Sequence, residues 1–103
     1  MYSILTIQKR LKEVLTNCLN ECFQISVPDL KIDIPTHKQN GDLTCNIAMQ
    51  LAKQLNQNPR EVATKIISQL ELPKSIAKVE MAGPGFLNFF LANQYLLRYL
   101  NEF

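Results

Sequence analysis

The chain has 103 residues, a length near the commonest size of a single domain. We therefore expect residues 1–103 to form one domain, which leaves no room for a catalytic domain beside a second module. The composition is 47% hydrophobic, which is typical of a globular chain and not of a disordered tail. A formal net charge of only +2 excludes the dense cationic surface of a histone-like protein. A nucleic-acid contact through a few residues stays open.

Cysteine usage and the N-terminal sequence indicate the compartment. Three cysteines are an odd number, which argues against a closed disulfide framework and favours a reducing environment. In residues 1–10 the basic side chains follow a short apolar stretch, the reverse of the order in a signal peptide. No apolar run approaches the ~20 residues that span a bilayer. We therefore expect a cytoplasmic chain with no membrane partner.

In the first half of the sequence, the spacing of apolar residues changes from helical to strand-like. Apolar residues first recur at steps of three and four, which is typical of an amphipathic helix. Between Pro28 and Pro35 the apolar and charged residues alternate, which is typical of a half-buried strand. The predicted helix, strand, polar loop and second short strand occupy residues 3–23, 30–34, 36–42 and 43–45.

The second half predicts three helices and a pair of strands. The run Asn58-Pro59-Arg60-Glu61 places an N-cap, a proline at the first helical position and a glutamate three residues after the cap. Two helices over residues 46–55 and from 59 to before Pro73 are followed by strands over 76–81 and 86–91 and a helix over 94–101. The order α-β-β-α-α-β-β-α predicts an α+β fold, a two-layer α/β sandwich in which a roughly four-stranded antiparallel sheet packs on helices.

No arrangement of residues in this sequence indicates catalysis. His37 is the only histidine, and it lies in a polar loop without a nucleophile motif around it. The cysteines form no CxxC pair, so core thiols are a better interpretation than a metal site of Cys18, Cys22, Cys45 and His37. Gly83-Pro84-Gly85 lacks the patterns of phosphate loops and leads into a strand, so it predicts a tight turn. We expect no catalytic, metal or cofactor-binding residues.

The strand predicted over residues 86–91 carries aromatic residues on both faces. If its odd-numbered residues pack against helices, Phe86 and Phe90 flank Asn88 on the opposite face. Two rings beside an amide provide a stacking surface and a hydrogen-bonding group for an unpaired nucleobase. Burial of both faces, or a neighbouring domain over Phe86, explains the same pattern. Phosphate contacts and an ordinary solvated face are both open for Lys38, Lys53, Arg60, Lys65, Lys74 and Lys78.

Three blocks of sequence resemble one protein family. They are residues 41–53 (GDLTCNIAMQLAK), 58–63 (NPREVA) and 82–91 (AGPGFLNFFL). Their order and spacing are similar to those of the N-terminal additional domain of arginyl-tRNA synthetases, and the resemblance covers nearly the whole chain. Each block alone is a weak signal, whereas the three together are specific.

The resemblance implies a tRNA-binding domain that contacts the D-loop corner of tRNA(Arg). In the family, an aromatic residue and an asparagine two positions later on the last strand contact a D-loop base, and these positions fall on Phe86 and Asn88. Phe90 and Asn93 are further candidates for the tRNA-binding site. The family often has a histidine directly before Gly-Asp, whereas here three residues separate His37 from Gly41. No role is therefore assigned to His37.

The resemblance also implies a parent enzyme, a class I arginine–tRNA ligase that uses ATP and Mg²⁺. The sequence contains neither a HIGH-like nor a KMSKS-like motif, so we expect this chain to bind and position tRNA without catalysing the reaction. Its expected partners are the D-loop of tRNA(Arg) and the catalytic domain of the same synthetase. The alternative is a protein-interaction module that docks through its exposed aromatic strand. Base reading needs the Asn88 amide, whereas docking mainly needs the rings.

Overall fold

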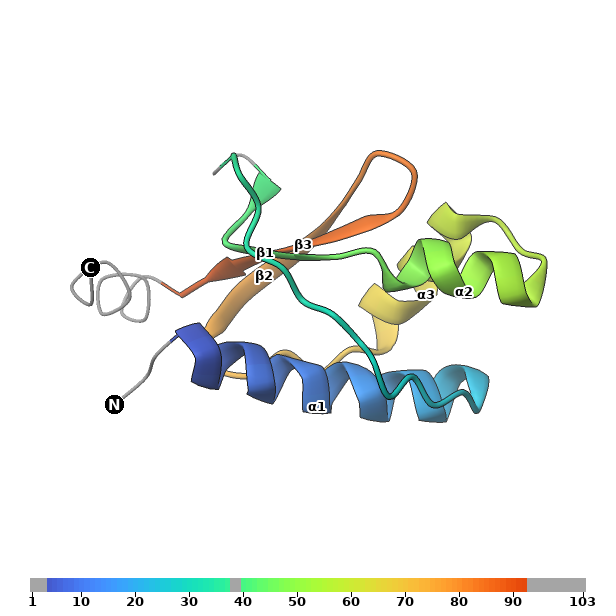
Figure 1. Ribbon diagram of the computed structural model, residues 1–103, viewed down its shortest axis with the longest axis horizontal. Helices are drawn as coiled ribbons and strands as arrows, with labels where there is room; N and C mark the ends of the chain where they lie inside the picture. The colour runs from blue at the N-terminus through green and yellow to red at the C-terminus, as the bar shows by residue number, and fades with distance from the viewer. Residues whose placement is uncertain (1–3, 38–39, 93–103) are drawn as a thin grey trace.

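The computed structural model describes residues 4–37 and 40–92, which form an α+β fold (Figure 1). In chain order the elements are α1 (Ile4–Phe23), β1 (Leu43–Cys45), α2 (Ile47–Leu55), α3 (Pro59–Gln69), β2 (Ile76–Ala82) and β3 (Phe86–Leu91). The helix predicted over residues 94–101 lies outside the described residues. Within the described part, no helix is long and apolar enough to cross a membrane.

Helix α1 buries one stripe of side chains, as its hydrophobic period predicts. It ends where Gln24 adopts a φ of 57° and donates its backbone N–H to the carbonyl oxygen of Asn20 at 2.9 Å. The buried residues of the helix are Ile7, Leu11, Leu15, Cys18 and Leu19. The amphipathic helix predicted from the sequence is confirmed over the described residues.

The chain ends α2 at Asn56 and begins α3 at the predicted N-cap, Asn58. Asn56, in the left-handed conformation with a φ of 54°, donates its backbone N–H to the Ala52 carbonyl oxygen and closes α2. The Asn58 side-chain oxygen then accepts a hydrogen bond from the backbone N–H of Arg60 at 2.8 Å. Pro59 occupies the first turn of α3, where its missing N–H costs nothing.

The sheet has three antiparallel strands in the order β1-β3-β2, so β3 is the central strand. On one side of β3, Thr44 pairs with Asn88. On the other side, Glu80 pairs with Asn88 and Lys78 pairs with Phe90. The β2–β3 hairpin turns through Gly83-Pro84-Gly85, and the Gly85 N–H donates to the Ala82 carbonyl oxygen at 3.2 Å. The predicted tight turn is thereby confirmed.

The prediction of a fourth strand over residues 30–34 is wrong. Asp33 makes one isolated bridge with Thr44, through two backbone hydrogen bonds of 2.8 Å each. The alternation is present, because Leu30 and Ile32 are buried. A ladder needs consecutive pairs, however, and the proline that follows at position 35 has no N–H to continue one. β1 is also only three residues long. The described elements therefore run α-β-α-α-β-β.

The helices pack on one face of the sheet. α2 contacts β3, α3 contacts β2, and α1 packs against α3. In Figure 1, α1 runs below the sheet while α2 and α3 lie together at one end of the molecule. The buried core side chains of β3 are Leu87, Phe89 and Leu91. We define the outer face as the opposite face of the sheet, which carries Thr44, Lys78, Glu80, Phe86, Asn88 and Phe90.

Candidate nucleic-acid interface

The three predicted residues of β3 differ in exposure on the outer face. Phe86 is 38% exposed and is one of the few exposed large hydrophobic side chains in the described residues. Phe90 is half-buried. Asn88 is only 5% exposed, although the sequence predicts an accessible amide there. The structure therefore places one accessible ring beside a largely buried carboxamide.

A groove on the outer face brings Phe86 and Asn88 together. It has a volume of about 310 Å³, at the lower end of the range for ligand sites. The loop before β1, the middle of β1 and the β2–β3 turn form its other walls. The residues that line it are Pro35, Asn40, Thr44, Ala82, Gly83, Pro84, Phe86 and Asn88. A flat aromatic ligand fits such a groove, because an exposed ring and a polar group both border it.

The Asn88 side chain is buried but hydrogen-bonded. Its carbonyl oxygen Oδ1 accepts a hydrogen bond of 2.8 Å from the hydroxyl of Thr44, the residue paired with it across β1 and β3. A buried carbonyl without such a partner would destabilise the fold. Among the described residues, Asn88 makes no other side-chain hydrogen bond. Its NH₂ group can therefore donate to a ligand in the groove.

The Gly41-Asp42 block docks directly on β3. Gly41 has a φ of +88°, and a Cβ atom at this position would lie 2.8 Å from the backbone oxygen of Phe89. The Asp42 N–H donates to the same oxygen at 2.8 Å. The Asp42 carboxylate in turn accepts from the Leu91 N–H at 2.9 Å. The first motif block thus holds the central strand at Phe89 and Leu91.

The second and third motif blocks contact each other at the hairpin. The Arg60 guanidinium donates a hydrogen bond to the carbonyl oxygen of Gly83. Gly85 has a φ of +140°, and a Cβ atom there would lie 3.2 Å from the Pro59 backbone oxygen. The N-terminus of α3 therefore anchors the turn that leads into Phe86. The three blocks therefore meet at β3 and the turn that precedes it.

Phe90 is covered by a neighbouring side chain. The Lys78 ammonium lies 4.7 Å from the centroid of the Phe90 ring, a cation–π distance. The same ammonium pairs with the Glu80 carboxylate at 2.8 Å. Phe90 thus offers less free ring surface than Phe86. The other candidate, Asn93, lies outside the described residues.

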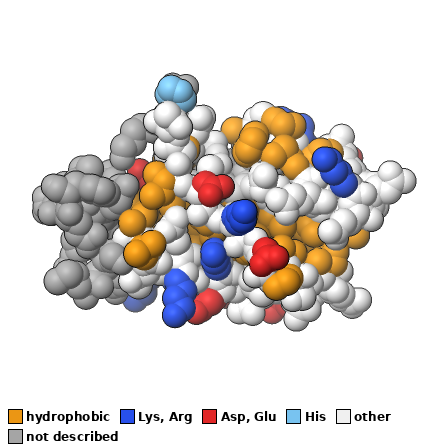
Figure 2. All heavy atoms as spheres, in the orientation of Figure 1, with side chains coloured by type: hydrophobic (Ala, Val, Ile, Leu, Met, Phe, Trp, Pro, Cys, Tyr) orange, Lys and Arg blue, Asp and Glu red, His pale blue; other side chains and the backbone are white. Residues whose placement is uncertain are grey.

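Charged side chains of both signs are interspersed on the face shown in Figure 2, and neither sign forms a continuous patch. The basic residues proposed for phosphate contact that the structure describes are all exposed: Lys53, Arg60, Lys65, Lys74 and Lys78. Arg60 and Lys78 already have the partners described above. Lys65 lies 5.0 Å from the Phe23 ring centroid. On the face shown in Figure 2, the cations are therefore separate from one another.

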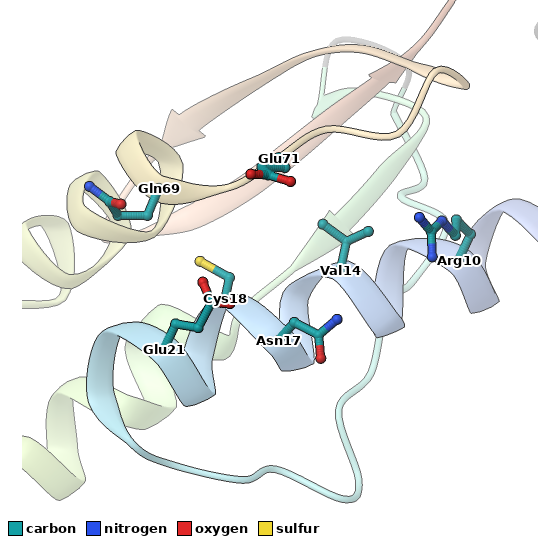
Figure 3. A pocket seen from close by; sticks show the side chains of 7 residues that line it. All are labelled: Arg10, Val14, Asn17, Cys18, Glu21, Gln69 and Glu71. Carbon is teal, nitrogen blue, oxygen red and sulfur yellow. The ribbon is translucent and has the colours of Figure 1, made fainter.

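Neither the cysteines nor His37 are among the residues that line the outer-face groove. Cys18 and Cys22 are separated by 3.9 Å between sulfur atoms on α1, and Cys18 also contacts the Ile66 carbonyl oxygen at 3.7 Å. Burial, followed by the contact with Cys22, raises the pKa of Cys18 to about 12. Figure 3 shows Cys18 on α1 at a polar pocket of about 190 Å³ below Gln69 and Glu71.

The remaining titratable candidates are dispersed as well. Cys45 is buried on the inner face of β1, and burial raises its pKa to about 11. His37, the pale blue side chain in Figure 2, is exposed in the loop before β1. Among residues 4–37 and 40–92, no group of three histidine, cysteine or acidic side chains could hold a metal ion.

Two residues that shape the candidate site are missed by reasoning from sequence. Thr44 lies in the first motif block without an assigned role, but the alternation of Leu43-Thr44-Cys45 already points its side chain away from the two apolar neighbours. Its pairing with Asn88 depends on the strand order β1-β3-β2, which the sequence pattern does not specify. Asp42 belongs to a motif block, yet its role in holding β3 emerges only from the structure.

Comparisons with known proteins agree with the fold and with the motif blocks. The family model described as "Arginyl tRNA synthetase N terminal domain" matches residues 6–91. Arginine–tRNA ligases of Staphylococcus aureus strains JH9 and COL are 39% identical over 98 residues, which is 93% of this chain. The chain belongs to the arginyl-tRNA synthetase N-terminal domain family. It spans only 18% of the length of these relatives.

Solved structures show the same similarity. The Thermus thermophilus arginyl-tRNA synthetase superposes with a TM-score of 0.75 at 29% identity, covering 88% of this chain and 15% of that one. The Plasmodium falciparum arginyl-tRNA synthetase shares the fold, with a TM-score of 0.73 at 23% identity over 87% of this chain and 17% of that one. The match to the family model reaches from α1 to the last residue of β3.

Proposed function

We propose that this chain is the tRNA-binding N-terminal domain of an arginine–tRNA ligase and that it contacts the D-loop corner of tRNA(Arg). Membership of the family supports a role in the aminoacylation of arginine tRNA. The observation that carries the more specific proposal is the outer-face groove, in which an exposed aromatic ring borders a hydrogen-bonded carboxamide. These two groups are what recognition of an unpaired base requires.

In this proposal, the Phe86 ring stacks on a base that is turned out of the D-loop. Stacking on an aromatic side chain contributes about 1–3 kcal/mol per base. Asn88 donates from its NH₂ group to the edge of the same base, since its oxygen is already bonded to Thr44. Exposed lysines contact phosphates, so affinity falls as salt rises, although few cations contribute. Phe90 and Asn93 remain weaker candidates for the same site.

Catalysis is assigned to the part of the synthetase that this chain does not span. The chain covers 18% of relatives named arginine–tRNA ligase. We propose that the remaining part binds ATP and Mg²⁺ and attaches arginine, while this domain holds the tRNA from its D-loop corner. The proposal includes the cytoplasm as the place of action and the catalytic domain as an intramolecular partner.

One observation favours the alternative of a protein-docking surface. Ile34 is 52% exposed and directly precedes Pro35, which lines the outer-face groove beside Phe86. Exposed apolar side chains near one another are typical of protein contacts. The two functions make different demands on Asn88, because a docking partner needs the rings and a base needs the amide.

The test is equilibrium binding of the chain, at low salt, to tRNA(Arg) and to transcripts in which each unpaired D-loop base is replaced in turn. The Phe86→Ala variant should bind tRNA(Arg) roughly 5- to 150-fold more weakly, the equivalent of one lost base stack. The Asn88→Ala variant should lose the preference among transcripts. Circular dichroism of each variant checks that the fold is retained.

A matched control separates the groove from exposed apolar surface in general. Leu5→Ala removes a side chain that is 73% exposed, more than Phe86, from α1. It should leave tRNA binding unchanged. Equal binding by wild type, Phe86→Ala and Asn88→Ala would refute base reading. The docking function would be favoured if Phe86→Ala, but not Asn88→Ala, no longer bound the catalytic domain of the synthetase.

A further inference from the structure

Thr44 of the first motif block and Asn88 of the third form a side-chain pair. They face each other in register across β1 and β3, and the Thr44 hydroxyl donates to Asn88 Oδ1 at 2.8 Å. Both side chains line the outer-face groove. The pair therefore lies at the point where a base edge would meet the carboxamide.

The backbone of Thr44 is held firmly in place. Its N–H donates to the Asp33 carbonyl oxygen and its own carbonyl oxygen accepts from the Asp33 N–H, each at 2.8 Å. β1 pairs with β3 on its other side. Both backbone polar groups of Thr44 are thus bonded to Asp33, and on the edge toward β3 its side chain lies opposite Asn88. The isolated bridge of Asp33 thus restrains the backbone of Thr44.

The hydrogen bond gives the carboxamide one preferred orientation. As it stands, the hydroxyl proton of Thr44 and the carbonyl oxygen of Asn88 satisfy each other. With the carboxamide turned by 180°, the NH₂ group would face the hydroxyl, and the bond from the hydroxyl proton to the Asn88 oxygen would be lost. Asn88 is only 5% exposed, so the hydrogen bond with Thr44 is the contact that fixes which end of its carboxamide faces the hydroxyl.

We propose that Thr44 is a positioning residue that turns the Asn88 NH₂ group toward the outer-face groove, so that the site selects a nucleobase presenting a hydrogen-bond acceptor there. This inference rests on the proposed function and specifies the ligand class of the same site. The acceptor is a ring nitrogen or a carbonyl oxygen on the base edge. Phe86 contributes stacking, which is tolerant of base identity, so discrimination arises from the Thr44–Asn88 pair.

Three substitutions test the pair, with the same transcripts of tRNA(Arg) altered in the D-loop. Thr44→Val keeps the shape and the strand preference but removes the hydroxyl. It should lower the preference for the native D-loop base about 3- to 10-fold, the value of one neutral hydrogen bond. Thr44→Ser restores the hydroxyl and should restore the preference. A purely structural role of Thr44 would lower affinity for every transcript equally and leave the preference unchanged.

Asn88→Asp tests the donor directly. The carboxylate has nearly the same shape and can still accept from Thr44, but it has no NH₂ group to donate. It should lose the preference for the native base, and Thr44→Val should add nothing to that loss. The ratio between transcripts is the quantity to compare, because the added negative charge weakens binding to all of them.

The free chain offers a second measurement that does not depend on RNA. In nuclear magnetic resonance spectra, the two Nδ2 proton signals of Asn88 should shift in Thr44→Val and return to their wild-type positions in Thr44→Ser. Unshifted signals would overturn the proposed orientation. This measurement also shows whether Thr44→Val is folded, and Thr44→Ala can replace it if it is not.

The failures of the two proposals are distinguishable. If the wild-type chain binds all transcripts equally, the proposed function fails and this inference fails with it. If the wild type discriminates and Thr44→Val discriminates equally well, base reading stands and the role of Thr44 is refuted. If Asn88→Asp keeps the wild-type preference, the site does not select an acceptor.

Discussion

Strand β3 has two faces that are built in different ways. On the inner face Leu87, Phe89 and Leu91 are all at most 4% exposed and pack into one core. On the outer face, residues of the same strand range from Asn88 at 5% to Phe86 at 38% exposed. Helices cover the first face, whereas loops, a turn and neighbouring side chains border the second.

This comparison shows where local sequence determines structure and where it does not. On the inner face of β3, alternation is sufficient, because Leu87, Phe89 and Leu91 point toward the helices and are all buried. On the outer face, exposure depends on residues far away in the sequence. The Thr44 hydroxyl donates a hydrogen bond to Asn88, and the Lys78 ammonium lies over the Phe90 ring. One strand thus carries the core on one side and the candidate site on the other.

Replacing one ring on each face of β3 should give the largest difference in the free energy of unfolding. Phe89 is fully buried, so Phe89→Ala should lower the free energy of unfolding by about 3–5 kcal/mol, through lost burial and an unfilled cavity. Phe86→Ala removes the same ring from the outer face and should cost less than about 1 kcal/mol. Urea denaturation of the two variants measures both values. Similar losses would mean that the outer face belongs to the core.

Alanine substitutions at Gly41 and Gly83 should differ in their cost to stability, by a smaller amount. Gly41→Ala places a methyl group 2.8 Å from the Phe89 backbone oxygen at a φ of +88°, so it should destabilise the domain by about 1–3 kcal/mol. Gly83 also has a positive φ of +54°, but the nearest atom to an added Cβ is the Phe86 ring, at 3.7 Å. Gly83→Ala should therefore cost only about 1 kcal/mol, from the backbone alone.

Thermal or urea unfolding of both glycine variants distinguishes close packing from backbone strain. If Gly41→Ala is no worse than Gly83→Ala, the close contact between the loop and β3 is not significant. The Gly83 variant serves a second purpose, because its methyl group adjoins Phe86. A loss of tRNA binding without a loss of stability would locate the binding surface at this turn.

Most of the fold can be predicted from the sequence, and the reasons are local. The stripe of α1, the Asn58-Pro59 start of α3 and the turn at Gly83-Pro84-Gly85 each depend on residues within a few positions of one another. The strand expected over residues 30–34 fails for a local reason, the proline that follows it, and for a non-local one. Its alternation is genuine, but a strand needs a partner of matching length, and β1 offers only three residues.

The candidate site can be predicted in part. The pattern of β3 identifies the outer face, and the structure does bring Phe86 and Asn88 to one groove. The pattern does not reveal that Asn88 is buried or that its oxygen is bonded to Thr44, because these facts depend on which strand lies beside β3. The convergence of the three motif blocks on β3 likewise requires the tertiary structure.

The smallest expected effect concerns β1, whose two faces carry Cys45 and Thr44. Burial raises the pKa of Cys45 to about 11 in the folded chain, from an ordinary value of 9.0. As the pH rises above 9, the unfolded chain therefore loses this proton first and is stabilised by ionisation. The free energy of unfolding should fall between pH 9 and 11, by about 1 kcal/mol at pH 10 from this thiol.

Cys45→Ala isolates that contribution from the other groups that titrate in the same range. The variant is less stable at pH 7, because a buried side chain is shortened. The gap between wild type and variant should then narrow as the pH rises from 9 to 11, since only the wild type has the thiol. Urea denaturation at pH 7, 9 and 10 measures this gap. A constant gap would mean that Cys45 ionises as easily in the folded chain as in the unfolded one, and that the inner face of β1 is open to water.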